Sequence, residues 1–354
     1  MRQVTFVVGT GRAGSTALTS VLQAHPDVLS LSELWFSIGP RGFRPGPLDG
    51  QRFWRLLAKP RPGLDAAIRS GAQAPEILYP RRPGRFTAQS GIPAISLVPL
   101  PALSDDPDGL YDELAAEVPT WPERSTTAHW LALFGWFCER FDRSAVVERS
   151  GYSLRLVPAL RDTFPDARFV HLFRNGPDCA LSMKDHPGFR MIVLLLEMCE
   201  RVGVRTIEDL TPAHAAQLPP DLAPLLSDTY DRSLIFDRSL PVDRFGALWS
   251  DIIIRGLADL AAIPAAQRTD LRYETLLADP AAELTRLADF VDVPAHPEWL
   301  EKAAVLLDPT RSGTAGKLPA AVRAEPSSSP PANQECRRSD CPKPSAGGPR
   351  KPRR

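Results

Sequence analysis

A glycine-rich run close to the N-terminus has the composition of an anion-binding loop. Residues 9–16 read Gly-Thr-Gly-Arg-Ala-Gly-Ser-Thr and follow the apolar stretch 4–8. Glycines allow backbone angles that aim successive N–H groups at one point, and the N-terminus of a helix after the loop adds partial positive charge. The spacing predicts that this loop holds a phosphate or sulfate group. The residues expected to contact the anion are Gly11, Arg12, Ala13, Gly14, Ser15 and Thr16.

The same run departs at one position from the phosphate loop of ATP- and GTP-hydrolysing proteins. In the pattern GxxxxGK[ST] a lysine neutralises the β and γ phosphates, and Ser15 stands at that position here. In those proteins an aspartate that binds magnesium normally ends a nearby strand, whereas the apolar stretch 169–173 is followed by Arg174. The loop therefore predicts a donor of lower charge that is held without a metal ion.

Arg174 and Ser182 form a second candidate anion site. Pro177 favours the start of a helix, so Ser182 is expected about one and a half turns into it. A guanidinium fork together with a hydroxyl suits a phosphate monoester. Two anion sites at one edge of a sheet call for a ligand with two separated phosphate-like groups, and 3'-phosphoadenosine-5'-phosphosulfate (PAPS) is such a ligand.

These runs resemble the motifs of the PAPS-dependent sulfotransferase superfamily, in particular its bacterial members and its tyrosylprotein branch. Residues 9–18 resemble the loop that holds the 5'-phosphosulfate, with Arg12 at its basic position and Ser15-Thr16 as its hydroxyl pair. Residues 169–182 resemble the motif that holds the 3'-phosphate, and Arg174 and Ser182 keep the family interval. The resemblance implies a transferase that moves a sulfuryl group from PAPS to a hydroxyl.

Two later segments are similar to further elements of the same family. Residues 271–280 resemble a segment whose tyrosine, here Tyr273, lies near the adenine. Arg311-Ser-Gly313 resembles a late Arg-x-Gly element that closes over the 3'-phosphate. The resemblance extends in order over residues 1–317, although 36–130 and 186–240 match only by position.

The resemblance also implies the catalytic residues. Glu33 is the expected general base, because the catalytic glutamate of the tyrosylprotein branch stands the same distance after the loop arginine. Arg12 and Arg149 are expected to stabilise negative charge on the sulfuryl group and the leaving phosphate. Many members have Lys-Thr-Pro or Lys-Ser-Pro where this chain has residues 149–151, Arg-Ser-Gly, so the positive charge is kept. No metal is expected, because cations already hold the leaving group.

Several alternatives stay open at this point. Glu33 could be a solvated carboxylate that caps the turn near Trp35, and His129 or His186 could then be the base, as in other branches of the family. His171 lies inside an apolar strand and is expected to be a packed core residue. The chain could also be a P-loop kinase- or NTPase-like protein without its lysine, or a non-catalytic relative that binds 3'-phosphoadenosine-5'-phosphate (PAP).

The elements around these residues indicate a three-layer α/β fold of the P-loop type, with a parallel sheet between helices. Strands are predicted at 4–8, 28–31, 145–147, 168–173 and 269–273, and most are followed by a helical pattern of apolar residues. The carboxyl ends of parallel strands meet at one edge. That edge should gather the polar residues that follow the strands, which are Arg12, Glu33, Glu148, Arg149, Arg174, Asn175, Tyr273 and Glu274.

Two stretches and the tail lie outside this pattern. Residues 36–130 and 186–240 have weak periodicity and are predicted to be irregular or helical insertions over the active edge. Residues 318–354 are rich in Pro, Ser, Lys and Arg, a composition that cannot bury enough apolar surface to offset the entropy of ordering. We therefore expect one sulfotransferase domain at 1–317, followed by a disordered tail.

The composition limits the partners. Lys plus Arg and Asp plus Glu both number 42, so no overall field draws the protein to nucleic acid or to a membrane surface. No signal peptide and no membrane span are expected, and the five cysteines lack the spacing of zinc ligands. A cytoplasmic protein is predicted, with a small-molecule, carbohydrate or lipid acceptor that carries a hydroxyl.

Overall fold

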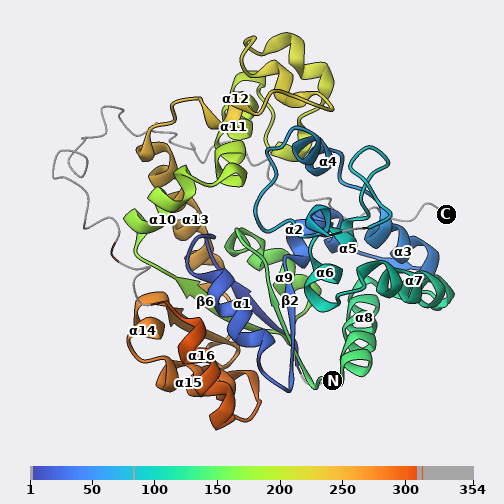
Figure 1. Cartoon of the computed structure of the whole chain (residues 1–354), viewed down its shortest axis with the longest axis vertical. Helices are drawn as coiled ribbons and strands as arrows, with labels where there is room; N and C mark the ends of the chain where they lie inside the picture. Colours follow the sequence, from blue (N-terminus) through green and yellow to red (C-terminus); the bar gives the residue numbers. More distant parts are fainter. Residues whose placement is uncertain (1–2, 83, 309–312, 314–354) are drawn as a thin grey trace, which may run out of the picture. The chain divides into compact units, whose positions relative to one another are not determined.

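A five-stranded parallel sheet is the centre of the computed structural model, which describes residues 3–82, 84–308 and 313 (Figure 1). The strand order is β2-β5-β1-β6-β7. The strands are β1 (Thr5–Val8), β2 (Val28–Ser32), β5 (Ala145–Arg149), β6 (Arg168–Phe173) and β7 (Arg268–Arg272). The first strand pairs with β5 on one side and β6 on the other, so the glycine-rich loop leaves the middle of the sheet. The predicted α/β class is confirmed.

Helices cover both faces of this sheet, which explains why its inner strands read as continuous apolar runs. All residues of β1 and β5 are buried. Alternate residues of a strand point to opposite faces, and Phe6 packs in one apolar cluster while its neighbour Val7 packs in another. The cluster around Val7 includes α1 (Ser15–Gln23), α14 (Tyr273–Ala278), α15 (Pro280–Val291) and α16 (Pro297–Leu306). The cluster around Phe6 includes α2 (Leu34–Ile38), α8 (Thr126–Phe141), α9 (Val157–Thr163) and α13 (Val242–Ala261).

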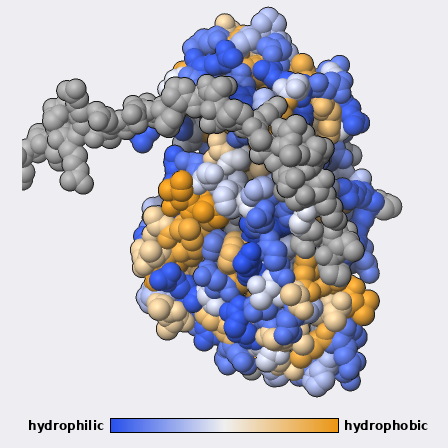
Figure 2. Space-filling view, turned by 90° about the vertical axis from the view of Figure 1, so that its left-hand side faces the viewer, coloured by the Kyte–Doolittle hydropathy of each residue, from blue (hydrophilic) through white to orange (hydrophobic). Residues whose placement is uncertain are grey.

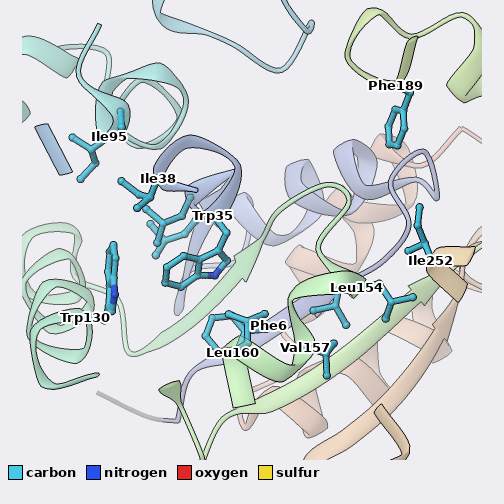
Figure 3. Packing of buried hydrophobic residues seen from close by; sticks show 14 of the residues in the cluster. Phe6, Trp35, Ile38, Ile95, Trp130, Leu154, Val157, Leu160, Phe189 and Ile252 are labelled. Carbon is cyan, nitrogen blue, oxygen red and sulfur yellow. The ribbon is translucent and has the colours of Figure 1, made fainter. Parts of the chain in front are cut away.

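The two stretches with weak periodicity are largely helical. The first contains α3 (Gly50–Ala58), α4 (Pro62–Arg69), α5 (Ala94–Leu97), α6 (Pro99–Leu103), α7 (Pro107–Glu117) and the antiparallel pair β3 (Pro47–Leu48) and β4 (Arg124–Ser125). The second contains α11 (Pro187–Val202) and α12 (Ser233–Phe236). Aromatic packing connects the first stretch to the sheet. The ring centre of Trp130 lies 4.9 Å from that of Trp35, which lies 6.2 Å from that of Phe6 in the central strand (Figure 3).

Element boundaries differ from the predictions by one or two residues. The fifth strand ends at Arg272, so Tyr273 begins helix α14 instead of ending the strand. Helix α10 (Gly176–Lys184) begins one residue before Pro177, and the Asn175 side chain accepts a hydrogen bond from the Asp178 backbone there. Asp279 caps α15, since its side chain accepts a hydrogen bond from Ala282 N.

The surface mixes hydrophilic residues with separate apolar patches on the face that Figure 2 shows. Among the described residues, none of the helices has the length and apolar character needed to cross a membrane. Arg311 and the predicted tail at 318–354 lie outside the described residues.

Candidate functional site

The glycine-rich loop has the backbone conformation that its composition predicted. Gly11 has φ 80°, Arg12 has φ 59° and Gly14 has φ 89°, all in the left-handed region. A Cβ atom on Gly14 would lie 2.1 Å from the Tyr273 ring, and one on Gly11 would lie 2.5 Å from the Phe189 ring. Only glycine fits either position, because both the backbone angle and the neighbouring ring exclude a side chain.

A small pocket lies between this loop and the end of β5. Its lining consists of Val7, Val8, Gly9, Gly11, Ala13, Ser15, Arg149, Ser150, Gly151 and Leu172. The glycine-rich loop lines one side of this pocket, and Arg149, Ser150 and Gly151 line the other.

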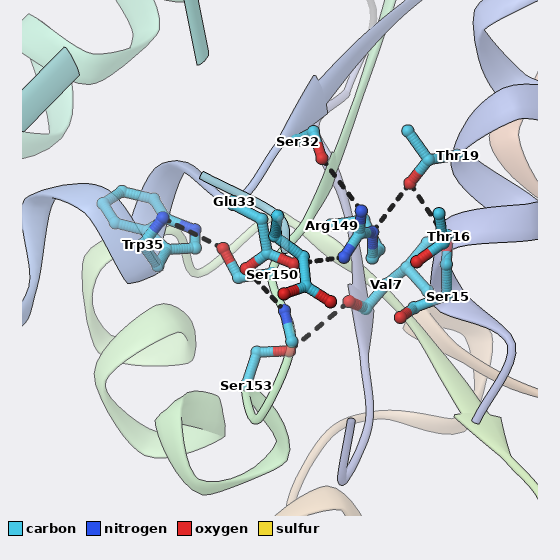
Figure 4. Close-up of polar contacts among 12 residues, drawn as sticks. Val7, Ser15, Thr16, Thr19, Ser32, Glu33, Trp35, Arg149, Ser150 and Ser153 are labelled. Atoms are coloured by element: carbon cyan, nitrogen blue, oxygen red, sulfur yellow. Dashed lines mark hydrogen bonds and ion pairs between the residues drawn. The ribbon is translucent and has the colours of Figure 1, made fainter. Parts of the chain in front are cut away.

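Arg149 and Glu33 form a buried ion pair next to the pocket (Figure 4). The Arg149 guanidinium donates from Nη1 to Glu33 Oε1, from Nε to Thr19 Oγ1 at 2.7 Å and from Nη2 to Ser32 Oγ at 2.8 Å. The other Glu33 oxygen, Oε2, accepts a hydrogen bond from Gly151 N at 2.9 Å. The side chains of both partners are about one-twentieth exposed, at 4% for Arg149 and 5% for Glu33.

Gly151 explains one departure from the family motif. A proline at this position would have no N–H to donate to Glu33. Ser150 is equally specific, because its Oγ accepts from Trp35 N at 3.0 Å and donates to Glu148 Oε1 at 2.5 Å. The Arg-Ser-Gly run thus supports Glu33 and the start of α2 together.

The surroundings of the ion pair shift the pKa of Glu33. Burial raises the pKa of Glu33, while the charge of Arg149 and the Gly151 N–H act in the opposite direction. The alternative of a solvated capping carboxylate is wrong, because Glu33 is 4% exposed and its side chain does not cap α2. Glu148 and Arg149 were expected to follow the strand, but both lie within β5, because the strand is two residues longer than predicted. Burial raises the pKa of Glu148 to about 8.

Arg12 joins the two predicted anion sites. Its Nε donates to Ser182 Oγ at 3.0 Å, and its Nη1 donates to Glu76 Oε1 at 3.3 Å. Arg174 Nη1 donates to the backbone oxygen of Arg12 at 3.4 Å. Arg12 follows β1, Arg174 follows β6 and Ser182 lies in α10. These three residues form one network of contacts.

Asp178 lies behind Arg174 and connects it to a distant segment. Its Oδ2 is 3.2 Å from Arg174 Nη2 and accepts a hydrogen bond from Gly313 N at 2.8 Å. The Arg174 guanidinium carbon lies 5.4 Å from the centre of the Tyr273 ring. Gly313 and Tyr273 thus lie close to Asp178 and Arg174, the residues around the predicted 3'-phosphate site.

The histidines differ in their surroundings. His129 is buried against the rings of Phe53 and Trp121, and its Nε2 is 2.6 Å from Leu48 O, so it belongs to the core of the first insertion. His171 is 5% exposed in β6, as expected of a packed residue. His186 lies near the site, because its Nε2 is 3.0 Å from Glu76 Oε2.

Two site residues were missed in the sequence. Glu76 lies in a stretch without periodicity, and its contact with Arg12 spans 64 positions, so no local pattern could have revealed it. Asp178 had a signal, since it stands four residues after Arg174 on a predicted helix start, the spacing at which opposite charges pair.

The comparisons with known proteins add structural matches only. No family model and no curated protein matches the chain. It is similar to the sulfotransferase domain of the Synechococcus PCC 7002 olefin synthase, with 16% identity and a TM-score of 0.47 over 90% of this chain and 88% of that one. It is also similar to the sulfotransferase domain from the curacin biosynthetic pathway, with 15% identity and a TM-score of 0.45 over 84% and 77%. A third match is sulfotransferase STF1 from Mycobacterium tuberculosis H37Rv, with 18% identity and a TM-score of 0.39 over 86% and 71%.

Proposed function

We propose that this chain is a sulfotransferase that moves the sulfuryl group of PAPS to a hydroxyl of an acceptor. The observation that carries the proposal is that the residues of the two candidate anion sites contact each other at one sheet edge. The loop after β1 has no lysine, and Arg12 in that loop contacts Ser182 of the second site. A donor with a 5'-phosphosulfate and a 3'-phosphate matches this pair of sites.

Each part of the donor has residues suited to it. The backbone N–H groups of residues 13–16 and the start of α1 are the expected contacts of the 5'-phosphosulfate. Arg174 and Ser182 are the expected contacts of the 3'-phosphate, and the resemblance assigns Arg311 and Gly313 to the same group. Tyr273, which packs on Gly14, is the expected neighbour of the adenine.

Glu33 and Arg149 would act together during transfer. The acceptor oxygen forms a bond to sulfur as the bond between sulfur and the bridging phosphate oxygen breaks, and PAP leaves. Glu33 takes the acceptor proton, a role that the raised pKa favours. Protonation removes the charge of Glu33 from Arg149, so that the guanidinium becomes available to the developing charge on the leaving oxygen. Arg12 stabilises the sulfuryl oxygens.

The proposal extends to the surroundings of the reaction. The proposed acceptor is a small molecule, carbohydrate or lipid with a hydroxyl. The structural matches are named as sulfotransferases. We place the reaction in the cytoplasm, and three buried free cysteines, Cys138, Cys179 and Cys199, suit a reducing compartment.

The experiment that tests the proposal compares PAP with adenosine 5'-phosphosulfate, which lacks the 3'-phosphate. Arg174→Ala should weaken PAP binding by about 100-fold and Ser182→Ala by about tenfold, the size of lost hydrogen bonds to a charged group. Binding of adenosine 5'-phosphosulfate should change by less than about threefold in both variants, because it makes no 3'-phosphate contact. Arg161→Ala is the matched control, since Arg161 pairs with the neighbouring Asp162 on the surface of α9. Equal losses for the two ligands would show that Arg174 and Ser182 do not hold the 3'-phosphate.

A further inference from the structure

Glu76 is a carboxylate inside a site that must bind an anionic donor. It lies between α4 and α5, and its Oε1 is 3.3 Å from Arg12 Nη1. The two side chains are partly exposed, at 22% for Glu76 and 30% for Arg12. In the proposed transfer, Glu76 is neither the general base nor one of the cations.

A second contact holds the same carboxylate from the other side. His186 Nε2 lies 3.0 Å from Glu76 Oε2, and His186 Nδ1 accepts a hydrogen bond from Gly188 N at 3.1 Å. A neutral histidine with Nδ1 as acceptor carries its proton on Nε2, so it donates to Glu76. Because both ring nitrogens are engaged, His186 has no free lone pair for an acceptor proton, and its role is to hold Glu76.

The Glu76 carboxylate is charged at neutral pH. Burial by itself raises its pKa, but the hydrogen bond from His186 and the positive charge of Arg12 lower it, and the net shift is downward. Two of the three guanidinium nitrogens of Arg12 are already used, Nε by Ser182 and Nη1 by Glu76. A donor anion that approaches Arg12 therefore meets the negatively charged Glu76 carboxylate, which is already bound to the same guanidinium.

We propose that Glu76 is a tethered competitor of the donor: its carboxylate occupies Arg12 before PAPS binds, yields Arg12 to the donor's anionic group, and returns when PAP leaves. His186 keeps hold of the displaced carboxylate. This inference rests on the proposed function. As a consequence, the nucleotide binds more weakly and dissociates faster. Faster dissociation benefits an enzyme whose turnover depends on product release.

The test measures PAP affinity and dissociation rate in the full chain. Glu76→Gln keeps the size of the side chain and removes its charge. We expect PAP to bind this variant about three- to tenfold more tightly, the range of one partly exposed ion pair, with a correspondingly slower dissociation rate. Glu113→Gln is the matched control, because Glu113 pairs with Arg140 at 2.7 Å on the surface and should leave PAP binding unchanged.

The outcomes separate this inference from the proposed function. If the wild-type chain binds PAP and Glu76→Gln binds it equally or more weakly, the competitor role is wrong while the proposed function stands. If the wild-type chain fails to bind PAP at millimolar concentration, the proposed function itself fails. Glu76→Ala gives the same readout should the glutamine variant not fold, and circular dichroism reports folding in each case.

Discussion

At the scale of single residues, substitutions in the Glu33–Arg149 pair are expected to affect both the activity and the stability of the protein. Removing one partner of a buried ion pair leaves an uncompensated charge, which typically costs about 3–5 kcal/mol of stability. Both side chains are nearly buried. A variant at either position can therefore lose activity through unfolding, so activity and stability have to be measured together.

Glu33→Gln tests the general base. The amide keeps one oxygen, which can still accept from Arg149 Nη1, but its NH2 group then faces Gly151 N, so some stability is lost. The amide cannot take up a proton. Turnover is expected to fall by about 100- to 10,000-fold, while PAP affinity, which depends on the loop and Arg174, should hardly change. The measurements are sulfuryl transfer from labelled PAPS and PAP binding by calorimetry.

Two results would revise this assignment. Turnover close to that of the wild type would mean that the base lies elsewhere, and Glu76 would be the next residue to change. A joint loss of PAP binding and melting temperature would make Glu33 a structural partner of Arg149.

Glu148 gives a prediction for the pH dependence of stability. Burial raises its pKa from 4.5 to about 8 in the folded chain, so the folded state binds an extra proton between these values. Its contribution to the free energy of unfolding is complete below pH 4.5 and is lost as the pH rises through about 8. Glu148→Gln removes this titration and still accepts a hydrogen bond from Ser150.

Urea unfolding at pH 5, 7 and 9 checks this prediction. Relative to the wild type, Glu148→Gln should become more stable as the pH rises, because the wild type alone has to ionise a buried carboxyl group. Parallel pH profiles for the two proteins would mean that Glu148 does not titrate in this range in the folded chain.

At the scale of elements, the loop between β1 and α1 depends on its glycines. Gly14→Ala places a methyl group into the Tyr273 ring at a positive φ, whereas Gly203→Ala, at φ 72° after α11, meets no atom within 4 Å. Gly203→Ala should cost about 1 kcal/mol of stability from backbone strain alone and leave PAP binding unchanged.

Gly14→Ala is expected to cost more than its control and to weaken PAP binding at least about tenfold, because Tyr273 and the loop have to move apart. Thermal melts and PAP titrations of the two variants measure the difference. Equal effects of both variants on PAP affinity would show that contact between the loop and Tyr273 is not needed for binding.

The elements of the sheet could be predicted because buried parallel strands leave an apolar signature that does not depend on distant residues. The strand at 168–173 was predicted with the bounds that the structure has. The helices of 36–130 could not be predicted, because residues such as Trp130 are buried by contacts with Trp35 and Gly42, which are distant in sequence.

At the scale of the whole molecule, the sequence could predict that the candidate site residues share one edge of the sheet, but not how they pair. Parallel topology brings all strand ends to one edge, so Arg12, Arg149 and Arg174 could be placed together. The carboxylates that pair with these arginines are set by the conformations of loops. No sequence pattern predicts the contact of Glu76 with Arg12 or that of Gly151 with Glu33. Asp178 was the exception, as its spacing from Arg174 was readable.

The tail provides a prediction for the chain as a whole. Residues 318–354 follow the last motif attributed to the donor, and their composition is that of a solvated segment. A chain that ends at Lys317 should keep PAP affinity and turnover within about twofold of the full chain. Calorimetry with PAP on both chains measures this, and a large loss of affinity would place the tail in the nucleotide site.

The most direct test of the account is a thermal shift with PAP in the presence of EDTA. Protein groups at both anion sites supply the charge, so a divalent cation should not be required. A ligand at 100 times its Kd adds about 2.7 kcal/mol of stability, which corresponds to a rise of several degrees in Tm. The account predicts this rise with PAP in EDTA and no comparable rise with Mg-ATP. A shift that EDTA abolishes, or protection by Mg-ATP alone, would contradict it and favour a kinase- or NTPase-like protein.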